Sequence, residues 1–487
     1  MSINITIPEL NIRDHYDQEI AQIADYIVNY QIKSEEAFNT ARFNLMDSLG
    51  CALLALNYPA CQKILGPIVL GATLKNGAKV PGTNYELDPV QAAFNLGTMI
   101  RWLDYNDTWL AAEWGHPSDN IGGILLIADY LMRQGKQKFT VRDVLIAMIK
   151  AFEVQGVLSL ENSFNQVGID HVVLVKVATA AVVTHLLGGN KAKICDAVSL
   201  AFLDGHSLRT YRQAPNVGTR KSWAAGDATA RGVFLALLVM RGEMGYPSVL
   251  TAKKWGLYDV YFKGKAFKFQ RPYGSYVMEN ILFKIAFPGE YHGQTAIEAA
   301  IRLHPEIKKR IREVDDIERV TVRTQMPAMN IINKKGELHN PADRDHCLQY
   351  MIAVGLIFGE VTANSYEDTA ARDSRIDTLR NKMEVIEESS FTRDYYDPDK
   401  RAFANAIQVF FRDGSHTDEI LIEYPLGHRR RRAEGIPLLE KKFRENLLTR
   451  FNQATTEKII AVFSEHEKLN KMPVNQFIDL FCEVKEK

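Results

Sequence analysis

The chain has 487 residues and a mass of 55.1 kDa, which is long enough for two or three domains. Apolar residues make up 46% and charged residues 24% of the chain, an ordinary globular composition that excludes a largely disordered protein. The 59 basic residues balance the 59 acidic residues, so the formal net charge is zero. The chain as a whole therefore has no electrostatic attraction to nucleic acid or to an anionic membrane. Any anion that binds must be held by a local cluster of cations.

The cysteines and the N-terminus bear on the cellular compartment. The five cysteines are Cys51, Cys61, Cys195, Cys347 and Cys482, and no two of them form a C-x-x-C pair. This scatter predicts reduced thiols and argues against a zinc ribbon or an iron–sulfur cluster. The sequence contains no signal-peptide pattern and no apolar run long enough to span a bilayer. We therefore expect a cytoplasmic protein that is not embedded in a membrane.

Helical patterns dominate the first half of the chain. Ala37, Ala41, Leu45 and Leu49 recur every four residues, as on one face of a helix that begins after Ser34. Small residues on several faces of the later helices indicate tight packing in a large all-α domain. These later helices are predicted at 90–104, 121–134, 142–160, 171–188, 192–204 and 221–242.

The pattern changes after about residue 280. Val320, Val322 and Thr324 alternate with Thr and Arg, as in a half-buried strand. Residues 407–411 and 420–424 alternate in the same way, and the turn dipeptide Asp413-Gly414 between them predicts a β-hairpin. Helices are predicted at 341–360 and 367–385 in this region and at 438–450, 455–469 and 474–484 after it.

These patterns predict a mainly α fold with an α+β part. Residues 1–278 and 428–487, from the two ends of the chain, form a large all-α domain. Residues 279–427 form a smaller α+β domain inserted between them. We find no internal repeat of fixed period and no low-complexity segment.

The segment 101–120 holds the densest set of groups that could carry chemistry. Asp104 and Thr108 would share one face if the helix over 90–104 continued through them. Pro117 marks a turn that places His116 in a loop, where a side chain can meet a ligand. The competing interpretation is a helix end followed by a polar loop without a chemical role. The titratable residues of the segment are Asp104, Asp107, Glu113, His116 and Asp119.

Four further residues are candidates on weaker grounds. His171 follows the possible helix cap Asp170, and a histidine there is often structural. Lys221 lies in a basic, glycine-containing loop that enters a helix and would suit a carboxylate or phosphate, unless the loop is merely solvated. Lys284 and His292 lie on either side of a Phe-Pro pair at the domain junction, where a surface lysine and a capping histidine are the alternative.

Other classes of function have little support. The sequence lacks the dinucleotide fingerprint, the P-loop, H-E-x-x-H and G-x-S-x-G. A metal site built from Asp104, Asp107, His116 and His171 matches no standard ligand set, so no metal is predicted. The run Arg429-Arg-Arg-Arg432 predicts a solvated loop and is poor evidence for nucleic-acid binding.

Several segments, in order along almost the whole chain, resemble the MmgE/PrpD family. Asp104-Tyr-Asn-Asp-Thr108 followed by His116-Pro-Ser resembles the family's D-x-x-D-T…H-P-S segment, and His171 lies at its second histidine. The segment that begins at Lys221 resembles K-x-x-x-x-G-x-A-A. Further matches are Lys284…Pro288…His292 and a segment from Asn340 to Tyr350. The Lys, Pro and His of the first of these are spaced differently in other branches of the family.

The resemblance implies a fold, a reaction and a set of site residues. It implies an active site between a large helical domain and an inserted lid, a homodimer, and no cofactor or iron–sulfur cluster. It implies elimination of water from 2-methylcitrate to give 2-methyl-cis-aconitate, with weaker activity on citrate and cis-aconitate. Details at 114–117, 209–212, 271–275 and 427–430 favour this branch over a decarboxylase branch. The implied catalytic residues are Asp104, His116, His171 and Lys221, and the implied substrate-binding residues are Thr108, Arg212, Lys284 and His292.

Such a reaction removes a weakly acidic proton beside a carboxylate and expels a tertiary hydroxyl from a tricarboxylate. Cations must hold the substrate and stabilise the developing charge, and histidines near their neutral pKa suit the proton transfers. Asp104 beside a trianion must be paired with a Lys or His, orient that partner, or be partly protonated. The sequence leaves open which histidine is the base. Decarboxylation of cis-aconitate, a hydratase or isomerase acting on related tricarboxylates, and a non-catalytic polycarboxylate-binding protein are the alternatives.

Overall fold

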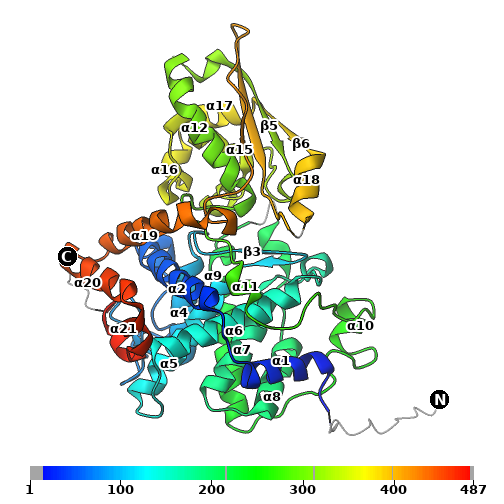
Figure 1. The fold of residues 1–487 in the computed structure, drawn as a ribbon, viewed down its shortest axis with the longest axis vertical. Helices are drawn as coiled ribbons and strands as arrows, with labels where there is room; N and C mark the ends of the chain where they lie inside the picture. Colours follow the sequence, from blue (N-terminus) through cyan, green and yellow to red (C-terminus); the bar gives the residue numbers. More distant parts are fainter. Residues whose placement is uncertain (1–14, 214–216, 311–312, 398, 483–487) are drawn as a thin grey trace.

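The computed structural model describes residues 15–213, 217–310, 313–397 and 399–482. Figure 1 shows a large helical part, the body, with a smaller part, the lid, above it. The chain enters the lid once and returns once, so both ends of the described chain belong to the body. The fold is mainly α with an α+β part, which confirms the predicted fold class.

The body consists almost entirely of helices. Its two short hairpins are β1 (Ala78–Lys79) with β2 (Glu86–Leu87), and β3 (Trp109–Leu110) with β4 (Trp114–Gly115). From the first part of the chain come α1 (Gln18–Asn29), α2 (Glu35–Ala55), α3 (Pro59–Gln62), α4 (Pro89–Arg101), α5 (Ile121–Arg133), α6 (Val141–Ser159), α7 (Val172–Leu186), α8 (Lys191–Leu203), α9 (Arg220–Met240), α10 (Leu257–Tyr261) and α11 (Tyr276–Glu279). From the last part come α19 (Arg432–Leu448), α20 (Gln453–Ser464), α21 (His466–Lys471) and α22 (Val474–Asp479).

The lid packs helices against a four-stranded sheet with the strand order β6-β5-β7-β8. Strand β5 (Ile317–Thr324) pairs in parallel with β6 (Met383–Glu387) and antiparallel with β7 (Asn405–Phe411), which pairs antiparallel with β8 (Ile420–Ile422). The helices are α12 (Gln294–Arg310), α13 (Met326–Ile331), α14 (Pro341–Arg344), α15 (Leu348–Phe358), α16 (Asp368–Ala371), α17 (Ser374–Arg380) and α18 (Ser389–Tyr396).

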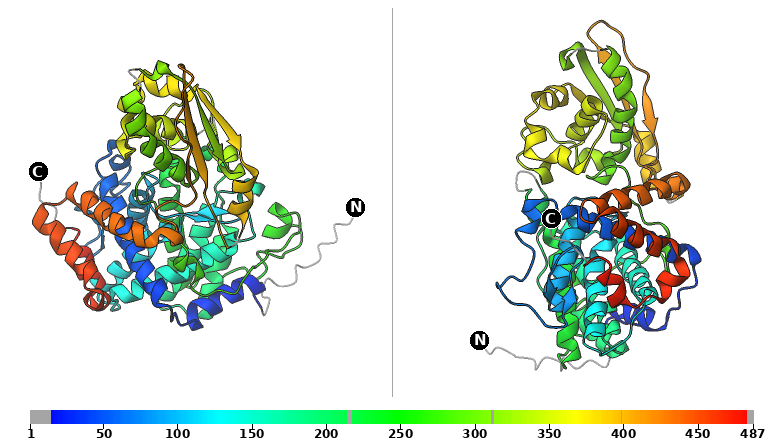
Figure 2. Two further views of the ribbon diagram at one scale, coloured as in Figure 1. Left: turned by 45° about the horizontal axis from the view of Figure 1, so that its top comes forward. Right: turned by 90° about the vertical axis from the view of Figure 1, so that its left-hand side faces the viewer.

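The two parts have separate hydrophobic cores. The larger core takes residues from 20 to 285 and from 439 to 481, whereas the core of the lid takes residues from 296 to 422. Ile281, Phe283 and Ile285 therefore pack in the body, although the boundary predicted at residue 279 places them in the lid. Helix α19 follows the lid and lies across the body directly beneath it (Figure 1 and Figure 2).

Small residues bring the central helices of the body together. A Cβ atom on Gly226 of α9 would lie 2.5 Å from the carbonyl oxygen of Phe94 in α4, and one on Gly97 would lie 2.9 Å from the Cα of Gly226. No larger side chain fits at this crossing. The close approach fixes Arg101, the last residue of α4, and Lys221, at the start of α9, at the top of the body.

Helix α9 is long and apolar enough to cross a membrane by length and composition alone. However, 61% of its apolar window is buried inside the protein, against α4 and α7 among others. It is therefore a core helix, whose apolar character comes from helix packing.

Several predicted helices differ from the structure. The helix predicted over 341–360 is interrupted at residues 345–347, between α14 and α15, and the one predicted over 455–469 is interrupted at Glu465, between α20 and α21. The helix predicted over 438–450 begins earlier, at Arg432. The helix predicted over 90–104 ends at Arg101, because Asp104 adopts a left-handed conformation (φ 49°) and is held there by tertiary contacts. The helix predicted over 367–385 ends at Arg380, and its last residues form β6, because pairing with β5 outweighs the helix propensity of Met and Glu. The last predicted helix ends at Asp479, and residues 483–484 lie outside the described residues.

Candidate active site

A cavity of about 160 Å³ lies between the body and the lid. It is smaller than the roughly 300–1,000 Å³ typical of sites for drug-sized ligands, so it suits a small metabolite. Its walls are rich in charged and hydrogen-bonding groups. Body residues on its wall include Arg101, Asp104, Thr108, Trp114, His116, Asn165, His171, Arg209, Arg212 and Lys284, and residues that follow the crossing into the lid include Glu290, Asn330, Lys334 and His346.

Asp104 is the centre of the first group of charges. Its buried carboxylate accepts a hydrogen bond from Lys284, whose Nζ also donates to the Asp104 carbonyl at 3.0 Å. Arg101 Nη1 lies 2.9 Å from Asp104 Oδ1, and Lys221 Nζ lies 3.8 Å from Oδ2. These contacts explain why a non-glycine residue keeps a left-handed backbone at this position.

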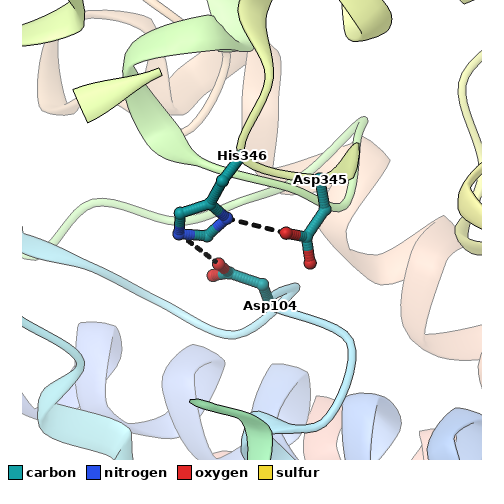
Figure 3. A group of neighbouring side chains, drawn as sticks. All are labelled: Asp104, Asp345 and His346. Carbon is teal, nitrogen blue, oxygen red and sulfur yellow. Dashed lines mark hydrogen bonds and ion pairs between the residues drawn. The ribbon is translucent and has the colours of Figure 1, made fainter. Parts of the chain in front are cut away.

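The lid completes this group. Lys221 Nζ donates to Asp345 Oδ1 at 2.6 Å and to the Ala342 carbonyl at 3.2 Å, and it lies 2.9 Å from His346 Nδ1. Figure 3 shows His346 between Asp345 of the lid and Asp104 of the body, with Nε2 3.7 Å from Asp104 Oδ2. We call Arg101, Lys221 and Lys284, with Asp104 and Asp345, the lysine cluster.

The cations of the lysine cluster stabilise the charges of its two carboxylates. Burial alone would raise the pKa of Asp104, but the charges of Arg101, Lys284 and Lys221 outweigh it and hold the pKa well below its ordinary value. Burial likewise opposes the charge of Asp345, and Lys221 and His346 hold the pKa of Asp345 below its ordinary value. Both carboxylates are therefore ionised and matched with buried cations.

Asp104, Asp345 and His346 also place one donor atom each within 4.8 Å of one another, the spacing of a possible metal site. The donors are already committed, because Lys284 binds Asp104 and Lys221 binds Asp345. A divalent ion would have to enter beside these ammonium groups and displace them. The donor set therefore does not fit a metal ion.

His116 is held in one tautomer by the backbone. Its Nδ1 lies 2.6 Å from the carbonyl oxygen of Asp107, and a carbonyl can only accept a hydrogen bond. Nδ1 must therefore carry the proton, which leaves Nε2 as the basic nitrogen. Burial, together with the charges of Arg101 and Lys284, holds the pKa of His116 well below its ordinary value, so the free ring is neutral.

His171 faces His116 with a ring-centroid separation of 5.9 Å. It is buried, and neither ring nitrogen has a hydrogen-bond partner among the described residues. Its Nδ1 lies 3.6 Å from Asp170 Oδ1. Burial lowers the pKa of His171, Asp170 opposes this effect, and Arg212 and Arg209 add to it. The protonation of His171 therefore responds to any anion that neutralises the two arginines.

The two arginines form a second group of charges. Arg212 Nε donates to Asp170 Oδ2 at 2.5 Å and its Nη2 donates to Oδ1 at 3.3 Å, whereas Arg209 Nη1 stays 3.6 Å from Oδ2. The loop that carries them is tied down by the Asp170 N–H, which donates to the Ser207 carbonyl at 2.8 Å. We call Arg209 and Arg212, with Asp170, the arginine cluster.

The structure brings most of the predicted site residues to the cavity. Asp104, His116, His171, Thr108, Arg212 and Lys284 line it. Lys221 lies behind Asp104 and is buried, so the solvated-loop alternative is wrong for its side chain, and Lys284 is likewise not a surface lysine. His292 does not line the cavity: its Nδ1 lies 2.7 Å from Glu290 Oε1 and its Nε2 lies 3.1 Å from the Tyr395 hydroxyl.

Four residues that the sequence did not single out belong to the same site. Arg101 is the first residue of the segment that contains Asp104, so its proximity to Asp104 in the sequence could have predicted its place in the site. Asp345 and His346 fall within the Asn340 to Tyr350 segment of the resemblance, but nothing there marked them. Glu290, between Lys284 and His292, lines the cavity and lies within hydrogen-bond distance of His292 Nδ1.

Comparison with known proteins agrees with this architecture. The MmgE/PrpD N-terminal domain matches residues 21–270 and the C-terminal domain matches residues 287–467. The 2-methylcitrate dehydratase of Salmonella typhimurium is 60% identical over 477 residues, which cover 97% of this chain and 99% of that protein. The enzyme of the same name from Cupriavidus necator is 59% identical over 96% of this chain and 97% of its own length. The mitochondrial 2-methylcitrate dehydratase of Yarrowia lipolytica is 56% identical over 97% of this chain and 91% of its length. The chain therefore belongs to the MmgE/PrpD family.

Proposed function

We propose that the protein is a hydro-lyase that eliminates water from 2-methylcitrate to give 2-methyl-cis-aconitate. The observation that carries this proposal is the cavity itself, in which two buried histidines 5.9 Å apart lie among buried cations. The relatives at 56–60% identity over nearly the whole chain carry the name of this activity.

The charges suit a tricarboxylate. The lysine cluster has three cations and two carboxylates, and the arginine cluster has two cations and one carboxylate. Each cluster therefore keeps one positive charge in excess. Preorganised cations in a buried cavity stabilise the negative charge that develops on a carboxylate when the neighbouring carbon loses its proton.

His116 is the general base in this proposal. Its Nδ1–H is committed to the Asp107 carbonyl, so its Nε2 lone pair is the one available to accept the proton from carbon. The electron pair of that C–H bond forms the double bond as the C–O bond to the tertiary hydroxyl breaks. A neutral imidazole at the pH of the cell suits this role.

His171 is the general acid. When substrate carboxylates neutralise Arg209 and Arg212, the charges that oppose protonation of His171 are compensated, and Asp170 then favours the imidazolium. The protonated ring gives its proton to the departing hydroxyl, which leaves as water. Thr108, on the cavity wall with its hydroxyl 3.2 Å from the Gly115 carbonyl, keeps lone pairs for a hydrogen bond from the substrate hydroxyl.

We also propose that the reaction needs no metal or cofactor. The one set of grouped ligand atoms found among the described residues is engaged with Lys221 and Lys284, and the histidine pair supplies both proton transfers.

Location and assembly are further parts of the proposal. We propose a cytoplasmic location, supported by five free cysteines, although one relative carries a mitochondrial name. We propose a homodimer, as the family resemblance implies. Ile68, Val69 and Leu70 are 73%, 70% and 95% exposed and form an apolar surface that a second copy could cover. Light scattering on the purified protein tests the dimer, and a monomeric mass at micromolar concentration would contradict it.

The function is tested by an ultraviolet assay on chelator-treated protein. We expect absorbance from the new conjugated double bond to rise with 2-methylcitrate, faster than with citrate and undiminished by the chelator. Release of carbon dioxide from cis-aconitate without dehydration of 2-methylcitrate would favour the decarboxylase instead. Tight binding of 2-methylcitrate without turnover would favour a non-catalytic binding protein.

A further inference from the structure

Arg209 carries a buried guanidinium whose hydrogen-bonding capacity the protein itself does not fully use. The residue is 8% exposed and lines the cavity, yet its Nε and Nη1 atoms have no hydrogen-bond partner among the described residues. Its nearest carboxylate oxygen, Asp170 Oδ2, is 3.6 Å away and receives its hydrogen bond from Arg212 instead. A guanidinium has five N–H donors in a fixed fork, and burying them unused costs free energy.

The surroundings of Arg209 position it without forming a hydrogen bond to its guanidinium. The Trp114 ring lies 5.0 Å from its Cζ, and the backbone N–H of Arg209 donates to the Gly168 carbonyl at 3.1 Å. The other acid close to it is Glu113, whose oxygens accept from the backbone N–H of Asn165 and of Trp114. Asp170, Arg212 and Glu113 are thus the charged groups that face it, and none of them donates to or accepts from its side chain.

We propose that Arg209 is the receptor for one carboxylate of a tricarboxylate substrate and that it makes the site selective for tricarboxylates over dicarboxylates. This inference rests on the proposed function and adds the group that recognises the additional carboxylate. A planar guanidinium binds a carboxylate through two parallel hydrogen bonds, which uses the donors that the empty protein leaves unpaired. Arg212, already engaged by Asp170, shapes this end of the cavity and positions Asp170.

The alternative is that Arg209 stabilises the fold through Asp170. The two possibilities predict different changes in the melting temperature. Removing a buried cation that stabilises the fold lowers the melting temperature, whereas removing an unpaired one leaves it unchanged or raises it, because Asp170 keeps Arg212 as its partner.

The test compares Arg209→Met with the control Arg231→Met on α9, which removes the same charge from a half-exposed pair with Asp204. The probes are tricarballylate and glutarate, two unreactive acids that differ by one carboxylate. Calorimetric titration gives their dissociation constants, and thermal unfolding gives the stability of the free protein. We expect Arg209→Met to weaken tricarballylate on the order of 100-fold. We expect the dissociation constant of tricarballylate to rise to near that of glutarate, with an unchanged or higher melting temperature.

Two results would overturn the inference. Equal losses of affinity for tricarballylate and glutarate would mean that Arg209 acts on all anions and does not read the third carboxylate. A lower melting temperature with full selectivity for tricarballylate would mean that Arg209 is structural. These measurements need no turnover. Selectivity that depends on Arg209 would therefore stand even if the dehydration assay failed. Dehydration of 2-methylcitrate would likewise stand even if Arg209→Met kept its selectivity.

Discussion

The two cation clusters at the cavity differ in what they leave unpaired. In the lysine cluster each buried carboxylate accepts from at least one ammonium group, and the lid completes the network through Asp345. In the arginine cluster one carboxylate is shared unevenly, because Arg212 is hydrogen-bonded to it and Arg209 is only ion-paired with it at 3.6 Å. Arg101 of the lysine cluster also leaves Nε and Nη1 without a hydrogen-bond partner among the described residues, but its Nη1 lies 2.9 Å from Asp104 Oδ1, whereas Arg209 Nη1 lies 3.6 Å from Asp170 Oδ2. The lysine cluster therefore pairs its carboxylates more closely and joins body and lid, and Arg209 of the arginine cluster is the more weakly held guanidinium.

This difference shows how one site can stabilise the junction between body and lid and still bind a ligand. Breaking a buried ion pair costs much more than an exposed one, so a network that joins body and lid rewards full pairing. A binding site gains affinity only from donors that the free protein does not use itself. Each of the two histidines is influenced by a different cluster. The charges that depress the pKa of His116, after burial, come from Arg101 and Lys284, whereas Arg212 and Arg209 depress that of His171.

The largest expected effect separates proton transfer from binding. His116→Gln removes the basic nitrogen but keeps a side chain that can donate to the Asp107 carbonyl. We expect kcat/KM for 2-methylcitrate to fall about 100- to 10,000-fold, the usual contribution of a general base, while the dissociation constant of tricarballylate stays within a few-fold. His185→Gln, at an exposed position in the last turn of α7, is the control. Near-normal turnover by a folded His116→Gln protein would remove His116 from the mechanism.

A smaller effect tests whether the lysine cluster is structural. Lys284→Met leaves Asp104 buried with one fewer cation, so we expect the free energy of unfolding to fall by on the order of 3 kcal/mol. Lys191→Met breaks an exposed pair with Asp25 at 2.8 Å and is expected to lower the free energy of unfolding much less. Urea unfolding of the ligand-free proteins gives both values. Equal costs for the two substitutions would contradict the structural role of the lysine cluster.

The sequence predicted local structure well where one periodicity dominated. The helices of the body were located within a few residues because their apolar and small residues repeat over many turns. The end of α4 was misplaced because Asp104 leaves the helix to meet Lys284, a contact across 180 residues. Strand β6 was missed because its short Met-Glu-Val-Ile-Glu segment becomes a strand only through pairing with β5.

The site was predictable to the extent that its residues lie close together in the chain. Asp104, Thr108 and His116 fall within one short segment, and the resemblance added His171, Lys221 and Lys284. Nothing local places Asp345 beside Lys221, since 124 residues separate them. The contrast between Arg209 and Arg212 is likewise invisible in sequence, because it depends on which guanidinium reaches Asp170.

The next prediction concerns Glu113, the acid beside Arg209, and the change of the unfolding free energy with pH. Burial raises the pKa of Glu113 to about 7 from its ordinary value of 4.5. A raised pKa stabilises the folded protein fully below pH 4.5, and this contribution is lost as the pH rises through 7. We expect Glu113→Gln to lessen the decline in unfolding free energy between about pH 5 and pH 8 by on the order of 2 kcal/mol.

The control for this change is Glu243→Gln, an exposed glutamate of the body. Unfolding free energies at several pH values give the slopes for the three proteins. Ionised Glu113 would also offer Arg209 an internal counter-charge, so the affinity of the unaltered protein for tricarballylate should weaken over the same pH range. An unchanged slope in Glu113→Gln would show that Glu113 does not titrate between these pH values.

The smallest expected effect concerns His292, whose two ring nitrogens both have partners within the protein. These partners are Glu290 Oε1 at 2.7 Å and the Tyr395 hydroxyl at 3.1 Å, and His292 lies outside the cavity wall. Its effect on substrate must therefore pass through Glu290, which lines the cavity. His292→Gln should lower kcat/KM about 2- to 10-fold, the worth of one hydrogen bond, because glutamine can donate to Glu290 but holds it less firmly. Tyr395→Phe, which removes only the outer partner, should lower it less. A loss as large as that of His116→Gln would instead place His292 in contact with the substrate, in a more closed arrangement of the lid.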